Sequence, residues 1–280
     1  ARGPRTRLPR VNDSVDDSVQ VELAIIGGGN MGAALLGGLL DSGAFEATAI
    51  AVVEVVDARR DQLASQFPGV SVVAEVPRCS GAVIAVKPAD TPTAAAAAAG
   101  SGGAARVLSI AAGVRLATIE AATGSDVAVV RAMPNTPALV RLGACAISAG
   151  AHADREDVAW ARSILEAVGT VDEVDETLLD AFTGVAGSGP AYVFLVAEAL
   201  IAAAVAEGLE PDMAARVVRQ LLLGSATLLD REGDPTRLRE MVTSPNGTTA
   251  AGLAALADHD LRGAVRAAVR AATQRSRELG

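Results

Sequence analysis

The stretch that decides the fold runs from Val21 to Leu40 and reads VELAIIGGGNMGAALLGGLL. Leu23 to Ile26 is a continuous apolar run, typical of a strand covered on both faces, and Ala33 to Leu40 predicts a helix. The glycine-rich segment between them therefore lies where a strand turns into a helix. At such a turn, the free backbone N–H groups of the helix N-terminus favour a bound phosphate.

The turn contains three glycines in G-x-G-x-x-G spacing, Gly27, Gly29 and Gly32. The first permits the tight turn, the second lets the backbone approach a pyrophosphate, and the third lets the helix pack closely against the strand. Glu54 follows the next apolar run, Ile50 to Val53, where an acceptor for a ribose hydroxyl is expected. Together, the two halves of the pattern predict a dinucleotide site.

The residues around Glu54 leave the choice of dinucleotide open. Glu54 is expected to bond the ribose hydroxyls of NADH and to repel a 2′-phosphate. Arg59 and Arg60, in the first turns of the next helix, either grip that phosphate or are solvated surface charges. Because the carboxylate is fixed at a strand end, we expect both NADH and NADPH to work, with NADH modestly favoured.

The composition bounds the class of protein. The chain has 280 residues, half of them hydrophobic, which is enough for two domains with sizeable cores. A net charge of −9 argues against nucleic acid or an anionic membrane as the main partner. Cys79 and Cys145 lie far apart without metal-binding spacing, so we expect no metal site and a cytoplasmic location.

Apolar runs that alternate with helical segments predict βαβ units and a doubly wound parallel sheet. After about Val171 only helical patterns follow. We therefore expect a flexible tail over 1–19, a dinucleotide-binding Rossmann domain over 20–170 and an all-helical substrate and dimerisation domain over 171–280. The six expected strands are Leu23 to Ile26, Ile50 to Val53, Val70 to Val73, Ala82 to Val86, Val107 to Ile110 and Val127 to Val130.

One segment of the second half, Pro190 to Glu207, is apolar on every side except at Glu198. A membrane span is one alternative at this length, but the central carboxylate and the absence of flanking basic clusters argue against it. We expect a helix buried in a subunit interface, and therefore an obligate dimer.

Four loops lie where ligands bind. Lys87-Pro88 and Met133 to Pro137 follow strands, and in open α/β sheets ligands bind at the carboxyl ends of strands. Gly187 to Pro190 and Ser244 to Thr249 place small residues and free N–H groups at helix N-termini, which attract a carboxylate. For each loop, an ordinary turn or capping role is the alternative.

Together these motifs resemble those of the pyrroline-5-carboxylate reductases, which catalyse the last step of proline biosynthesis. The resemblance runs from about Val21 to the C-terminus. It implies a Rossmann domain, a helical domain that interlocks two subunits, and often a decamer built from dimers. It rests on GGGNMG, AVKP at Ala85 to Pro88, RAMPNTP at Arg131 to Pro137, GSGPAY, and VTSPNGTT at Val242 to Thr249.

The resemblance also implies the residues of the site. Thr249 corresponds to the family's hydroxyl beside the substrate nitrogen, and its loop to the cradle of the substrate carboxylate. The family has SPGGTT where this chain has Asn246, but asparagine tolerates a left-handed backbone, so we expect the loop to keep its shape. The expected substrate contacts are Ser244, Asn246, Gly247, Thr248, Thr249, Gly189 and Pro190, and the expected cofactor contacts are Gly27, Gly29, Asn30, Met31, Gly32, Glu54, Arg59, Val86, Lys87, Pro88 and Asn135.

The implied reaction is hydride transfer from NADH or NADPH to the C=N carbon of 1-pyrroline-5-carboxylate. No strong acid is required if the imine binds protonated, and His152 and His259 lie in polar contexts that do not indicate catalysis. The alternatives are another imine or β-hydroxyacid dehydrogenase, or a dinucleotide-binding protein without turnover. The hydroxyacid enzymes resemble one another in having a lysine early in the helical domain, whereas Lys87 is the only lysine of this chain.

Overall fold

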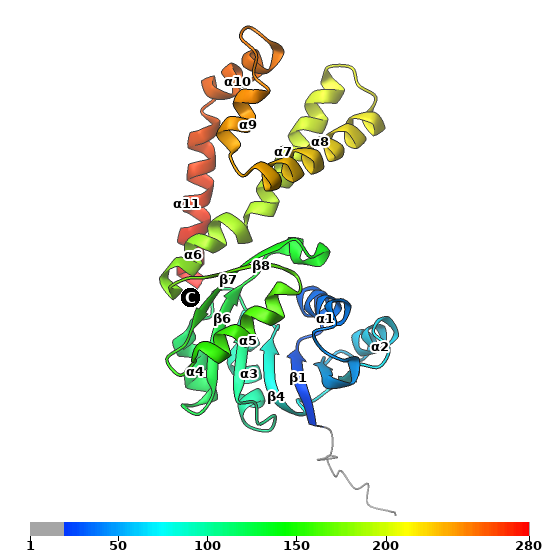
Figure 1. Cartoon of the computed structure of the whole chain (residues 1–280), viewed down its shortest axis with the longest axis vertical. Helices are drawn as coiled ribbons and strands as arrows, with labels where there is room; N and C mark the ends of the chain where they lie inside the picture. Colours follow the sequence, from blue (N-terminus) through cyan, green and yellow to red (C-terminus); the bar gives the residue numbers. More distant parts are fainter. Residues whose placement is uncertain (1–19, 280) are drawn as a thin grey trace, which may run out of the picture.

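The computed structural model describes residues 20–279 and shows an α/β domain from which a group of helices projects (Figure 1). The predicted tail, 1–19, lies outside these residues. Eight strands form one sheet in the order β3-β2-β1-β4-β5-β6-β7-β8, which confirms the doubly wound fold. The strands are β1 (Gln20–Ile26), β2 (Ile50–Val53), β3 (Ser71–Val73), β4 (Arg78–Ile84), β5 (Arg106–Ser109), β6 (Ala128–Met133), β7 (Gly143–Ala149) and β8 (Gly169–Glu173).

Strand β1 contributes to two cores because successive side chains of a strand point to opposite faces. Leu23 and Ile25 belong to one core, and Ala24 and Ile26 to the other. Helices cover both faces, so the apolar run of β1 is removed from water on each side. The first core includes residues of α1 (Asn30–Ser42), α2 (Asp57–Gln66) and α5 (Arg155–Glu166), and the second includes residues of α3 (Thr91–Ala99) and α4 (Leu116–Thr123).

The sheet is larger than the sequence predicted. Strand β7 pairs antiparallel with β6, and β8 pairs parallel with β7. The expectation of six strands, all parallel, is therefore wrong for this end of the sheet. β7 reads GACAISA and carries one β-branched residue, Ile147, so the usual strand signal is weak. Since β8 extends to Glu173, the sheet continues past residue 170, and the position of the domain boundary stays a prediction.

A helical run of 31 residues, Glu176–Ala206, leads from the sheet into the projecting helices. It contains a π-helical turn, Thr183–Gly187, of a kind often found at functional sites. In Figure 1, α7 and α8 extend away from the sheet, whereas α11 returns to it beside α6. These helices are α6 (Leu179–Phe182), α7 (Gly189–Ala206), α8 (Pro211–Glu232), α9 (Pro235–Met241), α10 (Thr248–Asp258) and α11 (Leu261–Leu279).

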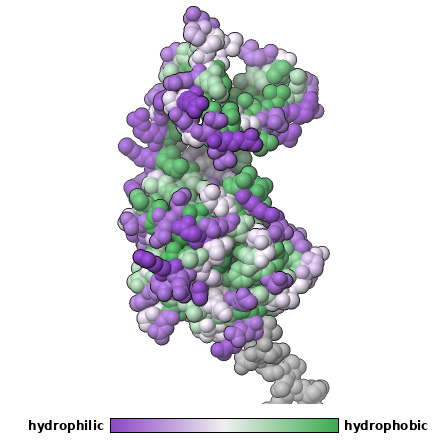
Figure 2. All heavy atoms as spheres, viewed as in Figure 1, coloured by the Kyte–Doolittle hydropathy of each residue, from purple (hydrophilic) through white to green (hydrophobic). Residues whose placement is uncertain are grey.

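Helix α7 is the apolar segment that the sequence placed in a subunit interface. By length and composition the run that contains it could cross a membrane, and none of its most apolar part is buried in the single chain. Phe194 is 62% exposed and Leu195 is 64% exposed. Figure 2 shows hydrophobic residues at the surface of the projecting helices. Such an apolar surface marks a binding interface.

Candidate active site

The glycine-rich turn has the geometry that a dinucleotide site needs. Gly27 has a φ of +110°, and a Cβ at this position would lie 2.5 Å from the carbonyl oxygen of Ala85. A Cβ on Gly32 would collide with the Gly27 carbonyl oxygen. Gly29 faces open space and caps α1 without any side-chain hydrogen bond. The first N–H groups of α1 are therefore accessible to phosphate oxygens, and this turn fits a pyrophosphate.

Glu54 is held beside the turn by two backbone donors. The N–H of Gly28 donates to its Oε2 at 3.2 Å, and the N–H of Val56 donates to its Oε1 at 3.0 Å. The carboxylate is thus already oriented before any ligand arrives. Sequence reasoning did not assign Gly28, the middle glycine of the GGG segment, to the site.

The two arginines after Glu54 are also tied to this turn. Nε of Arg59 donates to the carbonyl oxygen of Gly28 at 2.7 Å. Arg60 donates to the backbone oxygen of Glu54 at 2.9 Å and forms an ion pair with Asp57. Arg60 is therefore paired with a carboxylate of its own segment, whereas Arg59 bonds the turn and, through Nη1, the side-chain oxygen of Gln62 at 3.0 Å.

The other expected cofactor contacts lie at the ends of neighbouring elements. Asn30 and Met31 open α1, and Val86, Lys87 and Pro88 follow β4. The backbone N–H of Ala85 donates to Ile26 at 2.7 Å, which keeps this second loop beside β1. The side chain of Lys87 is exposed, and it forms no ion pair with any residue between 20 and 279. These cofactor contacts stay predictions.

The side-chain amide of Asn135 makes two hydrogen bonds to backbone groups of the described residues. Its Nδ2 donates to the carbonyl oxygen of Ala186 at 3.1 Å, and its Oδ1 accepts from the N–H of Ala144 at 2.9 Å. The amide thus joins the loop after β6 to the start of β7 and to the π-helical turn. A position near the cofactor stays a prediction for Asn135. Its bridging role depends on residues far along the chain, so no local motif could reveal it.

The loop before α10 forms a tight turn. The N–H of Gly247 donates to the carbonyl oxygen of Ser244 at 3.1 Å, with Pro245 in the second position. Asn246, in the third position, has a φ of 58°, the left-handed backbone expected there. Pro followed by a positive φ is the pattern of a type II turn. The loop therefore keeps its shape with asparagine in place of glycine.

Of the two expected substrate loops, one leads into an uncapped helix N-terminus. Gly247 precedes α10, whose first residues are Thr248 and Thr249, and no side chain bonds its first N–H groups. Gly189 and Pro190, in contrast, lie where the π-helical turn passes into α7 within one helical run, so the structure does not place this loop at a free helix N-terminus, and contact of these two residues with the substrate stays a prediction. The start of α10 can therefore offer N–H groups to a carboxylate.

A single chain does not bring the two halves of the expected site together. In Figure 1 the start of α1 lies in the α/β domain, whereas α10 lies at the far end of the projecting helices. The cofactor turn and the loop Ser244 to Thr249 are thus separated by the length of the helical group. The beginning of α7 lies between them in the chain.

The comparisons with known proteins cover both parts of the chain. Residues 176–279 match the family model described as pyrroline-5-carboxylate reductase dimerisation, and residues 22–113 match NADP oxidoreductase coenzyme F420-dependent. A pyrroline-5-carboxylate reductase of Synechocystis sp. is 42% identical over 268 residues, which are 94% of this chain and 99% of that protein.

Solved structures of pyrroline-5-carboxylate reductases are also similar to this chain. The structure of a pyrroline-5-carboxylate reductase from Coxiella burnetii is similar with a TM-score of 0.85 and 33% identity, over 93% of this chain and 98% of that one. That of Plasmodium falciparum pyrroline carboxylate reductase, solved with NADP bound, has a TM-score of 0.81 and 27% identity, with the same coverage.

Proposed function

Because the chain belongs to the pyrroline-5-carboxylate reductase family, we propose that it reduces 1-pyrroline-5-carboxylate to L-proline in the last step of proline biosynthesis. The observation that carries this proposal is the presence, in one chain, of a dinucleotide turn and a separate, preformed loop suited to a carboxylate. The turn is open at Gly29, and the loop is held by the hydrogen bond from Gly247 to Ser244. The reduction of a cyclic imino acid needs a turn that binds the dinucleotide and a loop that binds the carboxylate.

When bound, NADH or NADPH supplies the hydride. The residues of the chain have the remaining tasks. The first N–H groups of α10 hold the substrate carboxylate, and the hydroxyl of Thr249 bonds the ring nitrogen and keeps the imine carbon facing the hydride donor. Orientation of this kind supplies effective molarities of about 10⁵ to 10⁸ M for well-placed reactants. No strongly acidic side chain is required, since the imine enters protonated.

Two copies of the chain complete the site in this proposal. The separation of the dinucleotide turn from the loop Ser244 to Thr249 within one chain supports it, as does the match to a dimerisation model over 176–279. The exposed apolar surface of α7 is the natural contact between the copies. Larger assemblies built from the dimer, such as a decamer, extend the same arrangement.

NADH is the modestly preferred dinucleotide, and NADPH also works. The Glu54 carboxylate is fixed by two backbone N–H groups where the ribose hydroxyls are expected. A 2′-phosphate would meet this charge, and only Arg59 is placed to offset it, since Arg60 is paired with Asp57. We expect the enzyme in the cytoplasm, in keeping with two free, buried cysteines, Cys79 and Cys145.

The test is a direct assay of the purified protein with 1-pyrroline-5-carboxylate and each reduced dinucleotide, followed by the absorbance of the nicotinamide. We expect oxidation of the dinucleotide that depends on substrate, together with formation of proline. A β-hydroxyacid tested with the oxidised dinucleotide is the control for the alternative dehydrogenase. Turnover of that acid, without proline formation, would refute the proposal, and binding of dinucleotide without any turnover would point to a non-catalytic protein.

A further inference from the structure

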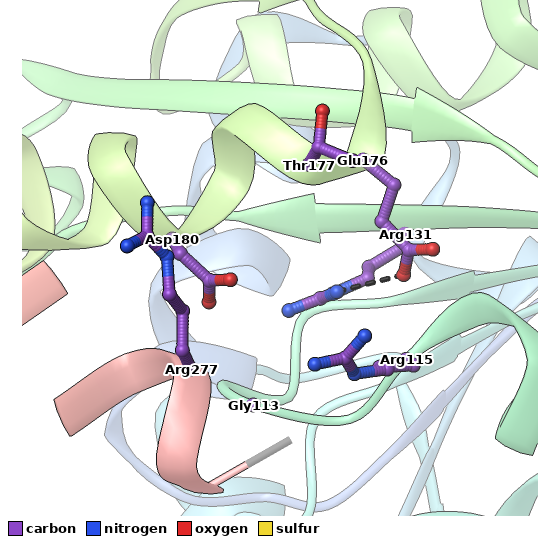
Figure 3. Close-up of a pocket in the computed structure, with 7 residues that line it drawn as sticks. All are labelled: Gly113, Arg115, Arg131, Glu176, Thr177, Asp180 and Arg277. Atoms are coloured by element: carbon purple, nitrogen blue, oxygen red, sulfur yellow. Dashed lines mark hydrogen bonds and ion pairs between the residues drawn. The ribbon is translucent and has the colours of Figure 1, made fainter. Parts of the chain in front are cut away.

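The segment from Arg131 to Asn135 holds the helical run Glu176–Ala206 at two points. Arg131, in β6, forms an ion pair with Glu176 at 2.7 Å, which Figure 3 shows on the wall of a cavity of about 350 Å³. Asn135, in the loop after β6, donates from Nδ2 to the carbonyl oxygen of Ala186 at 3.1 Å. The first contact fixes the residue at which the run begins, and the second fixes its π-helical turn.

The carbonyl oxygen of Ala186 needs a donor from outside the α-helical pattern. In an α-helix, each carbonyl oxygen accepts the N–H of the residue four positions later. For Ala186 that residue is Pro190, which has no N–H. The N–H of the next residue, Ala191, donates to the carbonyl oxygen of Ser188 at 3.1 Å. The side chain of Asn135 therefore supplies the hydrogen bond that the proline cannot make.

The π-helical turn Thr183–Gly187 is packed closely on two sides. A Cβ added to Gly187 would lie 2.8 Å from Cε of Met133, the last residue of β6. A Cβ added to Gly184 would collide with Oγ1 of Thr273 in α11. The turn is therefore held between the strand that leads to Asn135 and the helix that follows α10.

From these contacts we propose that Asn135 is a positioning residue for the reduction. Both ends of its amide bond the backbone of the chain, since Oδ1 accepts the N–H of Ala144 at 2.9 Å. It acts through the turn that it holds rather than through contact with the dinucleotide. That turn leads directly into Gly189 and Pro190, two of the expected substrate contacts. This inference rests on the proposed function of the chain.

The position of this hydrogen bond in the fold gives it a consequence for hydride transfer. Asn135 follows β6 at the carboxyl-end edge of the parallel strands, where the dinucleotide is expected. Its partner Ala186 lies 51 residues later, in the helical run. The bond therefore fixes a cofactor-side loop against a substrate-side segment. A misplacement of about 1 Å between reactants can cost about 10²-fold in rate.

Steady-state kinetics of the full chain test this role. Asn135→Ala should lower kcat by about 10- to 100-fold at saturating 1-pyrroline-5-carboxylate and NADH, because the turn is no longer held in place. The dissociation constant of NADH, from a fluorescence titration, should stay within about twofold of the wild-type value. Ser163→Ala removes the hydrogen bond of an exposed hydroxyl to the carbonyl oxygen of Trp160, and as the control it should keep both values.

Asn135→Asp gives a pH profile that a general loss of stability would not produce. A protonated carboxyl has a donor and an acceptor, as the amide has, whereas an ionised carboxylate has no donor for the carbonyl oxygen of Ala186. The ratio of kcat in this variant to kcat in the wild type should therefore rise as the pH falls from about 8 toward about 5. Circular dichroism at each pH verifies that both proteins are folded, and a ratio that does not change with pH would overturn the proposal.

A double-mutant cycle in thermal unfolding tests the link to Pro190 without any assay of turnover. Pro190→Ala provides an N–H four residues after Ala186. The decrease in Tm caused by Asn135→Ala should therefore be smaller in that background, by about 2 °C or more. Equal decreases in both backgrounds would show that Asn135 does not replace the missing N–H.

Two further kinetic results would contradict the positioning role. One is wild-type kcat in Asn135→Ala, and the other is a dissociation constant of NADH that rises in step with the loss of kcat, as expected for a direct cofactor contact. A wild-type protein without turnover would instead refute the proposed function, and with it the role of Asn135 in reduction. The cycle with Pro190→Ala would still decide whether the side chain replaces the missing N–H.

Discussion

Asn246 shows how one backbone angle preserves a binding loop. The family's loop has glycine at this position, and the backbone here has a φ of 58°, which asparagine adopts more readily than other residues with a side chain. The turn it completes places Gly247 before α10, so that Thr249 lies in the first turn of that helix. The substituted residue therefore keeps the position of the proposed catalytic hydroxyl.

Thr249→Ala should lower kcat/KM for 1-pyrroline-5-carboxylate by roughly 10²-fold, because one polarising hydroxyl is lost. Cofactor affinity should remain nearly unchanged, since the dinucleotide turn lies in the other domain. Steady-state kinetics and a fluorescence titration with NADH measure the two effects. Thr249→Ser, which keeps the hydroxyl, is the matched control and should retain most of the activity. Wild-type turnover in the alanine variant would exclude a catalytic role for the hydroxyl.

Glu54→Gln should shift the ratio of kcat/KM values toward NADPH by about tenfold, because the fixed charge that repels a 2′-phosphate is removed. The wild-type protein should prefer NADH modestly. Glu46→Gln, at an exposed carboxylate that precedes β2 whereas Glu54 follows it, should leave the ratio unchanged. A tenfold preference of the wild type for NADPH, abolished by Arg59→Ala or Arg60→Ala, would show that the arginines outweigh Glu54.

The two cysteines should be inert in the folded protein. Burial raises the pKa of the Cys79 thiol and of the Cys145 thiol to about 11. The thiolate is the reactive form, and at pH 8 about one thiol in a thousand would be ionised at that pKa. Because the raised pKa favours the protonated form, reactivity should appear only as the pH rises toward 11. Labelling with a thiol reagent at pH 8 checks this, with the urea-unfolded chain as the control, and rapid labelling of both thiols without denaturant would disprove it.

At the scale of elements, the junction between sheet and helices depends on one carboxylate. Glu176 begins the helical run and bonds both Arg131 of β6 and the N-terminus of α4 through Leu116. The start of the helical run thus meets α4 and β6, which lie 45 to 60 residues earlier in the chain, at one oxygen atom. The π-helical turn that follows is held by Asn135 through Ala186. These contacts hold the start of the helical run against the sheet.

Glu176→Ala should lower the free energy of unfolding by about 2 to 3 kcal/mol, because the buried Arg131 and the N–H of Leu116 lose their acceptor. Glu176→Gln keeps an oxygen acceptor and should cost less. Urea unfolding, monitored by circular dichroism, measures both. Glu173→Ala, at an exposed position three residues earlier, is the matched control and should be nearly neutral. An alanine variant as stable as the wild type would show that the junction does not depend on this carboxylate.

In the whole molecule, two features of the single chain indicate that it associates with a second copy. Its longest apolar helix is exposed, and its expected substrate loop is far from its dinucleotide turn. Burial of apolar surface is worth about 25 cal/mol per Å², so an exposed face of this kind favours a permanent interface. A second copy of the chain covers the helix and supplies the missing half of the site in the proposed arrangement.

The wild-type protein should therefore sediment as at least a dimer at micromolar concentration. Phe194→Glu places a charge on the exposed face of α7 and should produce monomers without reductase activity, while NADH binding at the separate turn persists. Analytical ultracentrifugation and NADH titration measure these properties. Leu142→Glu, at an exposed apolar position in the α/β domain, is the control and should remain dimeric. A wild-type monomer of 28.1 kDa with full activity would contradict the arrangement.

The dinucleotide turn, the doubly wound fold and the family could be predicted from the amino-acid sequence alone, because each rests on local constraints. Gly27 and Gly32 are required by close backbone contacts within one strand-turn-helix unit, and the apolar runs report strands covered on both faces.

The features that depend on pairing between residues far apart in the chain became visible only in the three-dimensional fold. β7 joined the sheet through its antiparallel bonds to β6, although its small side chains carry little strand preference. Asn135 and Glu176 bond partners that lie 45 to 60 residues away along the chain. The separation of the two loops likewise follows from how the helices pack. Periodicity and motif spacing are local, so they could not specify these long-range contacts.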